Sequence, residues 1–238
     1  MKILAVDSSS KVATCAVMDD DKLLGEYIIN HKMTHSKKLM PLIRDMLDSL
    51  ELTPEDIDLY AASEGPGSFT GLRIGIASIK AMAHAHNKKV VAIPTMEALA
   101  FNIPYGKGII VPMMDARRNR VYTGIYKWEN GEFYTIKEQD VMPVEELIDI
   151  LKERSEKIIV NGNGSVAYRE ELIEGLKDRI LFSPRSTNIA RASSIAELAM
   201  NKAKSDETID YHNLKPNYLR KSQAERQYDK RMKGNERK

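Results

Sequence analysis

The chain has 238 residues, of which 42% are hydrophobic and 29% are charged. This composition is typical of a globular protein with room for two cores of about 100 residues each, and it excludes a fibrous chain. No apolar run approaches the roughly 20 residues that a membrane helix needs, and the apolar stretch at residues 3–6 is too short for a signal peptide. The single cysteine, Cys15, cannot form an internal disulfide. We therefore expect a cytoplasmic protein that makes no membrane contact.

The formal net charge of +2 is unevenly distributed along the chain. Residues 220–238 contain eight Lys or Arg and three Asp or Glu, whereas residues 1–219 contain 28 basic and 31 acidic residues. The body is therefore mildly acidic and the C-terminal segment is basic. Such a segment either contacts nucleic acid or is simply solvated, and we expect 220–238 to be a disordered tail.

Short apolar strands and amphipathic helices follow one another in an order that occurs twice. In the first half we predict three strands, then helix, strand, helix, strand and helix, at residues 2–6, 12–18, 22–29, 34–50, 57–62, 72–86, 89–93 and 96–101. A run rich in proline and glycine at residues 104–108 interrupts the pattern. The same order then returns at residues 109–114, 121–128, 132–138, 143–154, 157–160, 165–176, 179–182 and 187–204.

Two mixed sheets with helices predict an α/β protein of two domains with a cleft between them. We place the N-terminal domain at 1–105 and the C-terminal domain at 106–219, whose end could pack back on the first domain. Duplicated βββαβα units are typical of the actin-like fold of actin, the sugar kinases and Hsp70. In that group the first hairpin faces nucleotide phosphates, so fold analogy alone makes Asp7, Ser8 and Ser9 candidate nucleotide-binding residues.

The most distinctive stretch is EGPGSFTGLRIG at residues 64–75, which joins a predicted strand to the helix at 72–86. Its glycines and Pro66 require tight turns, and Ser68 or Thr70 can cap the new helix. A strand, a glycine-rich turn and a helix start could cradle a phosphate group. The same glycines could instead let a second backbone come very close.

The helix at 72–86 is apolar on several sides, which indicates burial on more than one side. It is either an ordinary core helix or a helix that also docks on a partner. We predict that it forms a flat face with the helix at 34–50, and that small residues let a second pair of helices approach. The predicted interface residues are Leu39, Ile43, Met46, Leu72, Gly75, Ile76, Ala77 and Ile79.

Several short motifs occur in a characteristic order. They are ILAVDSS at 3–9, HS at 35–36, EGPGSFTGLRIG at 64–75, IPTMEALA at 93–100, DAR at 115–117 followed by VY at 121–122, and PNYLR at 216–220. Through these motifs and their order, the chain up to about Arg220 resembles the bacterial TsaB family, also called YeaZ. The stretch at 64–75 is highly specific for this family. The other motifs are weak singly, but their common order makes a chance match improbable.

The resemblance implies a non-catalytic subunit of the machinery that forms N6-threonylcarbamoyladenosine at position 37 of tRNA. It implies pairing with the catalytic sibling TsaD through helices of the N-terminal domain, and an ATPase partner, TsaE. It also implies a homodimer through the same surface when the chain is alone, and contact with tRNA only through the complex. No cofactor and no catalytic residue are expected.

The catalytic sibling binds a metal through an HxxxH motif, and the corresponding register here places Thr95 and Leu99 at the two ligand positions. A leucine cannot bind metal and a hydroxyl is a poor ligand, so we expect no metal site. His31 and His35 have helical spacing but span a predicted loop and helix start. The alternative functions are an independent ATPase or a glycoprotease-like peptidase, although the chain has no GxxxxGK[ST] motif and no GxSxG elbow.

Overall fold

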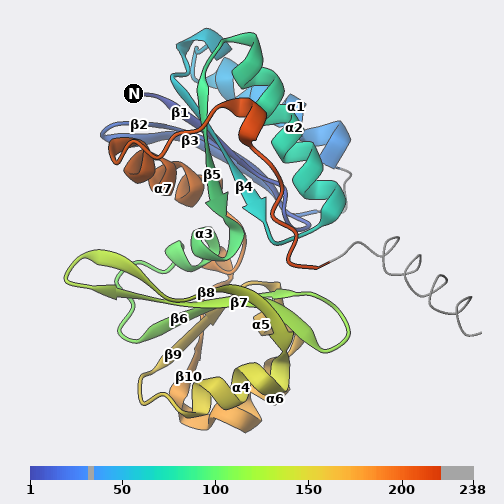
Figure 1. The fold of residues 1–238 in the computed structure, drawn as a ribbon, viewed down its shortest axis with the longest axis vertical. Coiled ribbons are helices and arrows are strands. Elements are labelled where there is room, and N and C mark those ends of the chain that lie inside the picture. Colours follow the sequence, from blue (N-terminus) through green and yellow to red (C-terminus); the bar gives the residue numbers. More distant parts are fainter. Residues whose placement is uncertain (32–34, 221–238) are drawn as a thin grey trace, which may run out of the picture.

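The computed structural model describes residues 1–31 and 35–220 and contains two mixed five-stranded sheets (Figure 1). The first sheet has the spatial order β3-β2-β1-β4-β5 and consists of β1 (Ile3–Asp7), β2 (Ala13–Asp19), β3 (Lys22–Ile29), β4 (Leu59–Gly65) and β5 (Lys89–Pro94). The second has the order β8-β7-β6-β9-β10 and consists of β6 (Ile109–Asp115), β7 (Arg120–Glu129), β8 (Glu132–Pro143), β9 (Ile158–Asn161) and β10 (Ile180–Phe182).

Both sheets have the same topology. In each, the first three strands pair antiparallel, and the fourth and fifth strands run parallel to the first. The predicted α/β class and the duplicated actin-like arrangement are therefore confirmed.

The helices differ from their predicted bounds mainly at their ends. The described α-helices are α1 (His35–Ser49), α2 (Phe69–Ala85), α3 (Thr95–Phe101), α4 (Val144–Lys152), α5 (Asn163–Ala167), α6 (Arg169–Leu176) and α7 (Ala192–Lys204). The helix predicted at 165–176 is divided, because Tyr168 leaves helical geometry at φ −115° and ψ 31°. The helix predicted at 187–204 begins only at Ala192, after a short 3₁₀ turn. Residue 34 and nearly all of the predicted tail lie outside the described residues.

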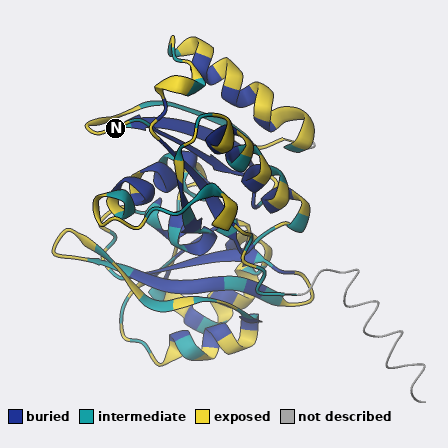
Figure 2. Ribbon diagram, turned by 45° about the horizontal axis from the view of Figure 1, so that its top comes forward, coloured by how far each residue is buried: buried dark blue, intermediate teal, exposed yellow. Residues whose placement is uncertain are grey.

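Helices cover both faces of the first sheet. Helices α1 and α2 pack on one face, where their apolar side chains join those of β1 and β2 in one core cluster. Helix α7 packs on the opposite face. All five residues of β1 are buried as a result, which explains why this strand reads as a continuous apolar run. In Figure 2 the inner strands are largely dark blue, whereas β3, β8 and the outer faces of the helices are mostly intermediate or exposed.

The last helix of each half contacts the other half of the chain. Helix α3 from the first half contributes Met96, Leu99 and Ala100 to a cluster with β6 and β7 of the second sheet, and Figure 1 shows it between the sheets. Helix α7 from the second half packs on the first sheet. Residue Leu214 also joins the core of the first sheet. Packing therefore does not follow the sequence-contiguous division at residue 105.

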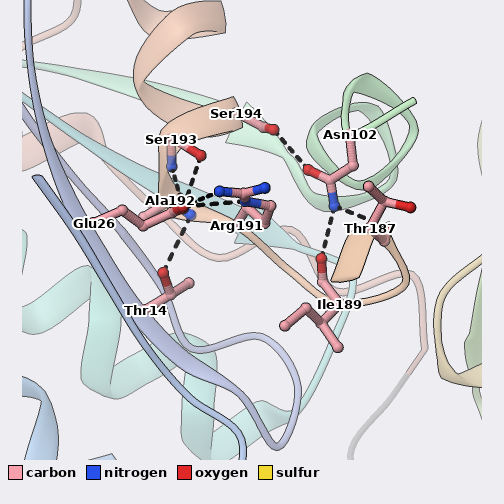
Figure 3. A network of polar contacts seen from close by, with 9 residues as sticks. All are labelled: Thr14, Glu26, Asn102, Thr187, Ile189, Arg191, Ala192, Ser193 and Ser194. Atoms are coloured by element: carbon pink, nitrogen blue, oxygen red, sulfur yellow. Dashed lines mark hydrogen bonds and ion pairs between the residues drawn. The ribbon is translucent and has the colours of Figure 1, made fainter. Parts of the chain in front are cut away.

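One carboxylate anchors the start of α7 to the first sheet (Figure 3). Glu26 of β3, whose side chain is 6% exposed, accepts hydrogen bonds from Arg191 Nε at 3.1 Å and Nη2 at 2.5 Å. It also accepts from the backbone N–H of Ser193 at 2.9 Å and from its hydroxyl at 2.7 Å. A negative charge at a helix N-terminus is favourable, so Glu26 fixes both the position and the direction of α7.

Within the described part of the chain, no helix combines the length and the apolar character that a bilayer crossing requires.

Candidate functional site

The glycine-rich stretch packs directly against the turn that follows β1. A Cβ atom on Gly71 would lie 1.9 Å from the Ser8 carbonyl oxygen, and one on Gly67 would lie 2.4 Å from the Ser9 carbonyl oxygen. The backbone N–H of Ser68 donates to that Ser9 oxygen at 2.6 Å. The glycines therefore admit a second backbone, and this backbone is residues 8–9 of the same chain.

Helix α2 begins at this contact, one turn earlier than predicted. The Ser68 hydroxyl accepts a hydrogen bond from the Gly71 N–H at 3.2 Å, which is the N-cap that the sequence suggested as one of two possibilities. Ser68 thus acts as a helix cap. The Ser8 hydroxyl donates to the Gly71 carbonyl at 2.8 Å, and a Cβ on Gly75 would lie 2.4 Å from that hydroxyl oxygen.

Of the three candidate nucleotide-binding residues, Asp7 lines a cavity. Ser8 and Ser9 are 2% and 0% exposed; Ser8 packs against α2 at Gly71 and Gly75, and Ser9 packs against the preceding turn at Gly67. Asp7 lines a cavity of about 170 Å³ between the two sheets. A cavity of about 150 Å³ holds a molecule of the size of benzene, so a whole nucleotide would need a more open cleft. Nucleotide contact at Asp7 remains a prediction.

Asp7 is 1% exposed, and its carboxylate accepts the Ser9 N–H at 2.6 Å. Burial raises the pKa of this carboxyl above its ordinary value, while the hydrogen bonds from Ser9 and Ser63 act in the opposite direction. A carboxyl group held in this way accommodates a proton more readily than one in water.

Thr95 and Leu99, which the sequence resemblance aligns with the metal-ligand positions of the catalytic sibling, lie at the same cavity. Thr95 is 1% exposed and Leu99 is 4% exposed, and both line the cavity with Asp7. Together they offer one hydroxyl oxygen and an alkyl chain. In the described ranges, no three His, Cys, Asp or Glu residues gather closely enough to hold a metal ion. Helix α1 starts at His35, so His31 precedes it and the two do not share a helix face.

The C-terminal PNYLR motif returns to the glycine-rich stretch, which the sequence did not indicate. The Asn217 N–H donates to the Glu64 carbonyl at 2.7 Å. The ring of Tyr218 stacks on Phe69 with centroids 3.9 Å apart and an angle of 7° between the planes. Arg73 donates to the Tyr218 hydroxyl at 2.9 Å.

Three further hydrogen bonds connect this junction to the second half of the chain. The Arg220 guanidinium donates to the Ala116 carbonyl in the DAR motif. Gln139 of β8 donates to the Gly65 carbonyl at 3.0 Å and accepts from the Met96 N–H at 3.3 Å. Motifs at 3–9, 64–75, 93–100, 115–117 and 216–220 therefore meet at one place. We call it the motif junction.

The predicted partner interface needs correction, because most of its residues lie in the core. Seven of the eight are buried against the first sheet or the turn after β1: Leu39, Ile43, Met46, Leu72, Gly75, Ile76 and Ile79. Their apolar faces are used by the chain itself, so a partner would not touch them in this conformation. Ala77 alone is exposed.

An outer surface remains on the same two helices. It consists of Met40, which is 45% exposed, and of the exposed residues Arg44, Arg73, Ala77 and Ala81. We call these five residues the α1–α2 outer face. The periodicity of 72–86 had indicated burial on more than one side, but it could not tell the sheet-facing side from the outer one.

Comparisons with known proteins agree on one family. A family model described as TsaD, tRNA N6-adenosine threonylcarbamoyltransferase, matches residues 22–228. The tRNA threonylcarbamoyladenosine biosynthesis protein TsaB of Bacillus subtilis is 32% identical over 226 residues, covering 94% of this chain and 96% of the relative. TsaB of Escherichia coli is 23% identical over 227 residues, with 94% and 96% covered. The solved structure of YeaZ from Pseudomonas aeruginosa gives a TM-score of 0.79 at 26% identity, covering 92% of this chain and 99% of that one.

The family model spans most of the chain, and the identity to a curated relative extends over nearly its whole length. The resemblance carried by the motifs is thereby confirmed, and the structure shows that those motifs share one junction. The chain belongs to the TsaB (YeaZ) family of tRNA threonylcarbamoyladenosine biosynthesis proteins.

Proposed function

We propose that the protein is a non-catalytic scaffold that supports the formation of N6-threonylcarbamoyladenosine at position 37 of tRNA by pairing with TsaD. The observation that carries this proposal is the α1–α2 outer face. It lies on two helices whose inner sides are fixed to the sheet, and its central residues are small.

The α1–α2 outer face suits helix-to-helix docking. The alanines at 77 and 81 are one helical turn apart and exposed, so another helix can approach α2 closely. Met40 adds an exposed apolar side chain nearby, and Arg44 and Arg73 supply positive charge at the border. A stable pairing would bury on the order of 1,500 Å². An apolar face of this kind also favours a homodimer when the partner is missing.

The chemistry of the motif junction supports a scaffold over an enzyme. The Ser68 hydroxyl caps a helix, the Ser8 hydroxyl binds the Gly71 carbonyl, and Leu99 stands at a metal-ligand position of the catalytic sibling. These groups hold the fold together. Catalysis would then belong to TsaD, with TsaE as the ATPase and tRNA bound through the complex in the cytoplasm.

The test places a charge on the outer face. Ala77→Glu leaves the core untouched because Ala77 is exposed, so the variant should fold normally yet lose co-purification with TsaD and the modification of tRNA. Ala167→Glu, at an exposed alanine of α5, is the matched control and should retain both. A folded Ala77→Glu variant that still pairs and supports modification would show that this face is not the interface.

The second candidate is an independent ATPase or peptidase, and ATP hydrolysis would depend on Asp7 at its cavity. Purified chain should turn over neither ATP nor peptides. ATP hydrolysis by the chain alone that disappears in Asp7→Asn would favour the enzyme and overturn the scaffold proposal.

A further inference from the structure

A second, larger cavity lies between α3, the end of the β7–β8 hairpin and α7, elements that can be located in Figure 1. Its volume is about 610 Å³, and it shares no lining residue with the cavity at Asp7. Part of its wall is aromatic and consists of Phe101, Tyr105, Trp128 and Phe133. A volume in the range of about 300–1,000 Å³ is typical of small-molecule sites.

The aromatic rings form a continuous wall. The Trp128 ring lies 5.1 Å from Phe133, 5.2 Å from Phe101 and 4.8 Å from Tyr105, measured between centroids. The indole N–H donates to the Ile103 carbonyl at 2.8 Å, which fixes the orientation of the ring. Tyr105 remains 68% exposed. A cluster that served only as core would cover its outermost ring.

The charges around the cavity are mostly negative. The lining includes Glu97, Glu132, Glu197 and Glu207 but only one basic side chain, Lys202. The Lys202 ammonium lies 4.0 Å from the Glu97 carboxylate, whose side chain is 19% exposed.

Glu97 is largely buried and lies close to other carboxylates. Burial raises the pKa of its carboxyl, and the neighbouring carboxylates of Glu138, Glu207 and Glu64 raise it further, while Lys202 opposes them. The lining itself contains four carboxylates and one ammonium group. A cation in this cavity would therefore lie close to both carboxylates and aromatic rings.

We propose that this cavity binds an organic cation, an alkyl guanidinium or alkylammonium group. Aromatic faces attract such cations through the ring quadrupole, and carboxylates supply charge-assisted hydrogen bonds. The cavity is larger than the charged group alone, so the alkyl chain would lie along the rings. The group is carried either by a free molecule or by a basic side chain of a protein segment. This inference does not depend on the scaffold proposal.

The chain itself provides the probe, because Trp128 is its single tryptophan and stands in the wall. Its fluorescence is measured during titration with agmatine and, separately, with a capped glycine–arginine–glycine tripeptide, against sodium chloride of equal ionic strength. We expect a saturable change with agmatine that sodium chloride does not reproduce. Saturation by the tripeptide as well would assign a protein side chain as the source. Saturation by agmatine alone would assign a free molecule.

Three variants test the wall and the charge. Glu132→Gln combined with Glu207→Gln should weaken binding at least about threefold, because two carboxylates are lost. Tyr105→Ala should weaken it by about two- to fivefold. Glu170→Gln combined with Glu174→Gln, at exposed positions of α6, is the matched control and should bind like the unmodified chain.

The proposal fails if neither probe gives a saturable signal in the unmodified chain. It also fails if the double variant at Glu132 and Glu207 binds as tightly as its control. Circular dichroism of all variants separates either result from a loss of fold.

Discussion

In the glycine-rich stretch, the absence of a Cβ atom at single glycines permits close packing. Gly67 and Gly71 have no Cβ, and this absence lets the turn after β1 sit against the start of α2. The sequence predicted a close approach or a phosphate cradle and could not choose between them. Choosing required the position of Ser8, which lies 63 residues away along the chain.

Gly71→Ala should destabilise the protein by about 3 kcal/mol or more, because the new Cβ would lie 1.9 Å from the Ser8 carbonyl oxygen. Gly25→Ala is the matched control, since its Cβ would meet Leu50 at an ordinary 3.4 Å. Urea unfolding of both variants measures the difference. Equal effects would mean that the turn after β1 moves aside freely.

Asp7→Asn should raise the Tm at pH 7, by about 2–4 °C per kcal/mol gained. Burial raises the pKa of the folded carboxyl above the ordinary value of 3.8, so the folded state binds more protons than the unfolded state between these two values. Stability therefore falls as the pH rises through that window.

The increase in Tm from Asp7→Asn should become smaller as the pH falls towards 4, where the Asp7 carboxyl is increasingly protonated in both the folded and the unfolded state. Thermal unfolding from pH 4 to pH 8 measures it. A gain that is constant with pH, or a loss at pH 7, would contradict this account of Asp7.

At the scale of elements, periodicity identified the helices but not what they pack against. The pattern at 34–50 predicted an apolar stripe, and Leu39, Ile43 and Met46 do form one in α1. The sheet of the same chain covers that stripe. An amphipathic pattern predicts that one side of a helix is buried, but only the tertiary structure shows which surface it packs against.

Glu26→Gln should loosen α7 and cost about 1–3 kcal/mol, because Arg191 and Ser193 lose a charged acceptor in a mostly buried position. Amide hydrogen exchange in α7 should accelerate more than exchange in α4. Asp45→Asn, in an exposed pair with Arg44 at 3.1 Å, is the control and should change little. Equal losses in the two variants would show that Glu26 is not the anchor.

At the scale of the whole molecule, the chain is held together by segments that cross between its halves. Helix α3 packs between the two sheets, α7 packs on the first sheet, and residues 216–220 run from the glycine-rich stretch to the DAR motif. The predicted boundary at residue 105 followed a change in local pattern. The sequence allowed the end of the second half to pack back on the first, but it did not indicate that α3 lies between the two sheets.

Tyr218→Ala should cost about 1–2 kcal/mol, because it removes the stack on Phe69 together with the bond from Arg73. Tyr218→Phe keeps the stack and loses only the hydroxyl, so its loss should be clearly smaller. Chemical unfolding of both variants provides the comparison. Identical losses would mean that the ring stack contributes nothing.

The sequence by itself determined the α/β class, the repeated order of elements and the family. These follow from local periodicity, turn chemistry and motif order, which are properties of neighbouring residues. Only the tertiary structure decided that seven predicted interface residues are core, that the motifs share one junction, that α3 lies between the two sheets and that α7 packs on the first. The physical reason is that burial and close approach depend on residues far apart in the chain, and neither periodicity nor spacing records which of them meet.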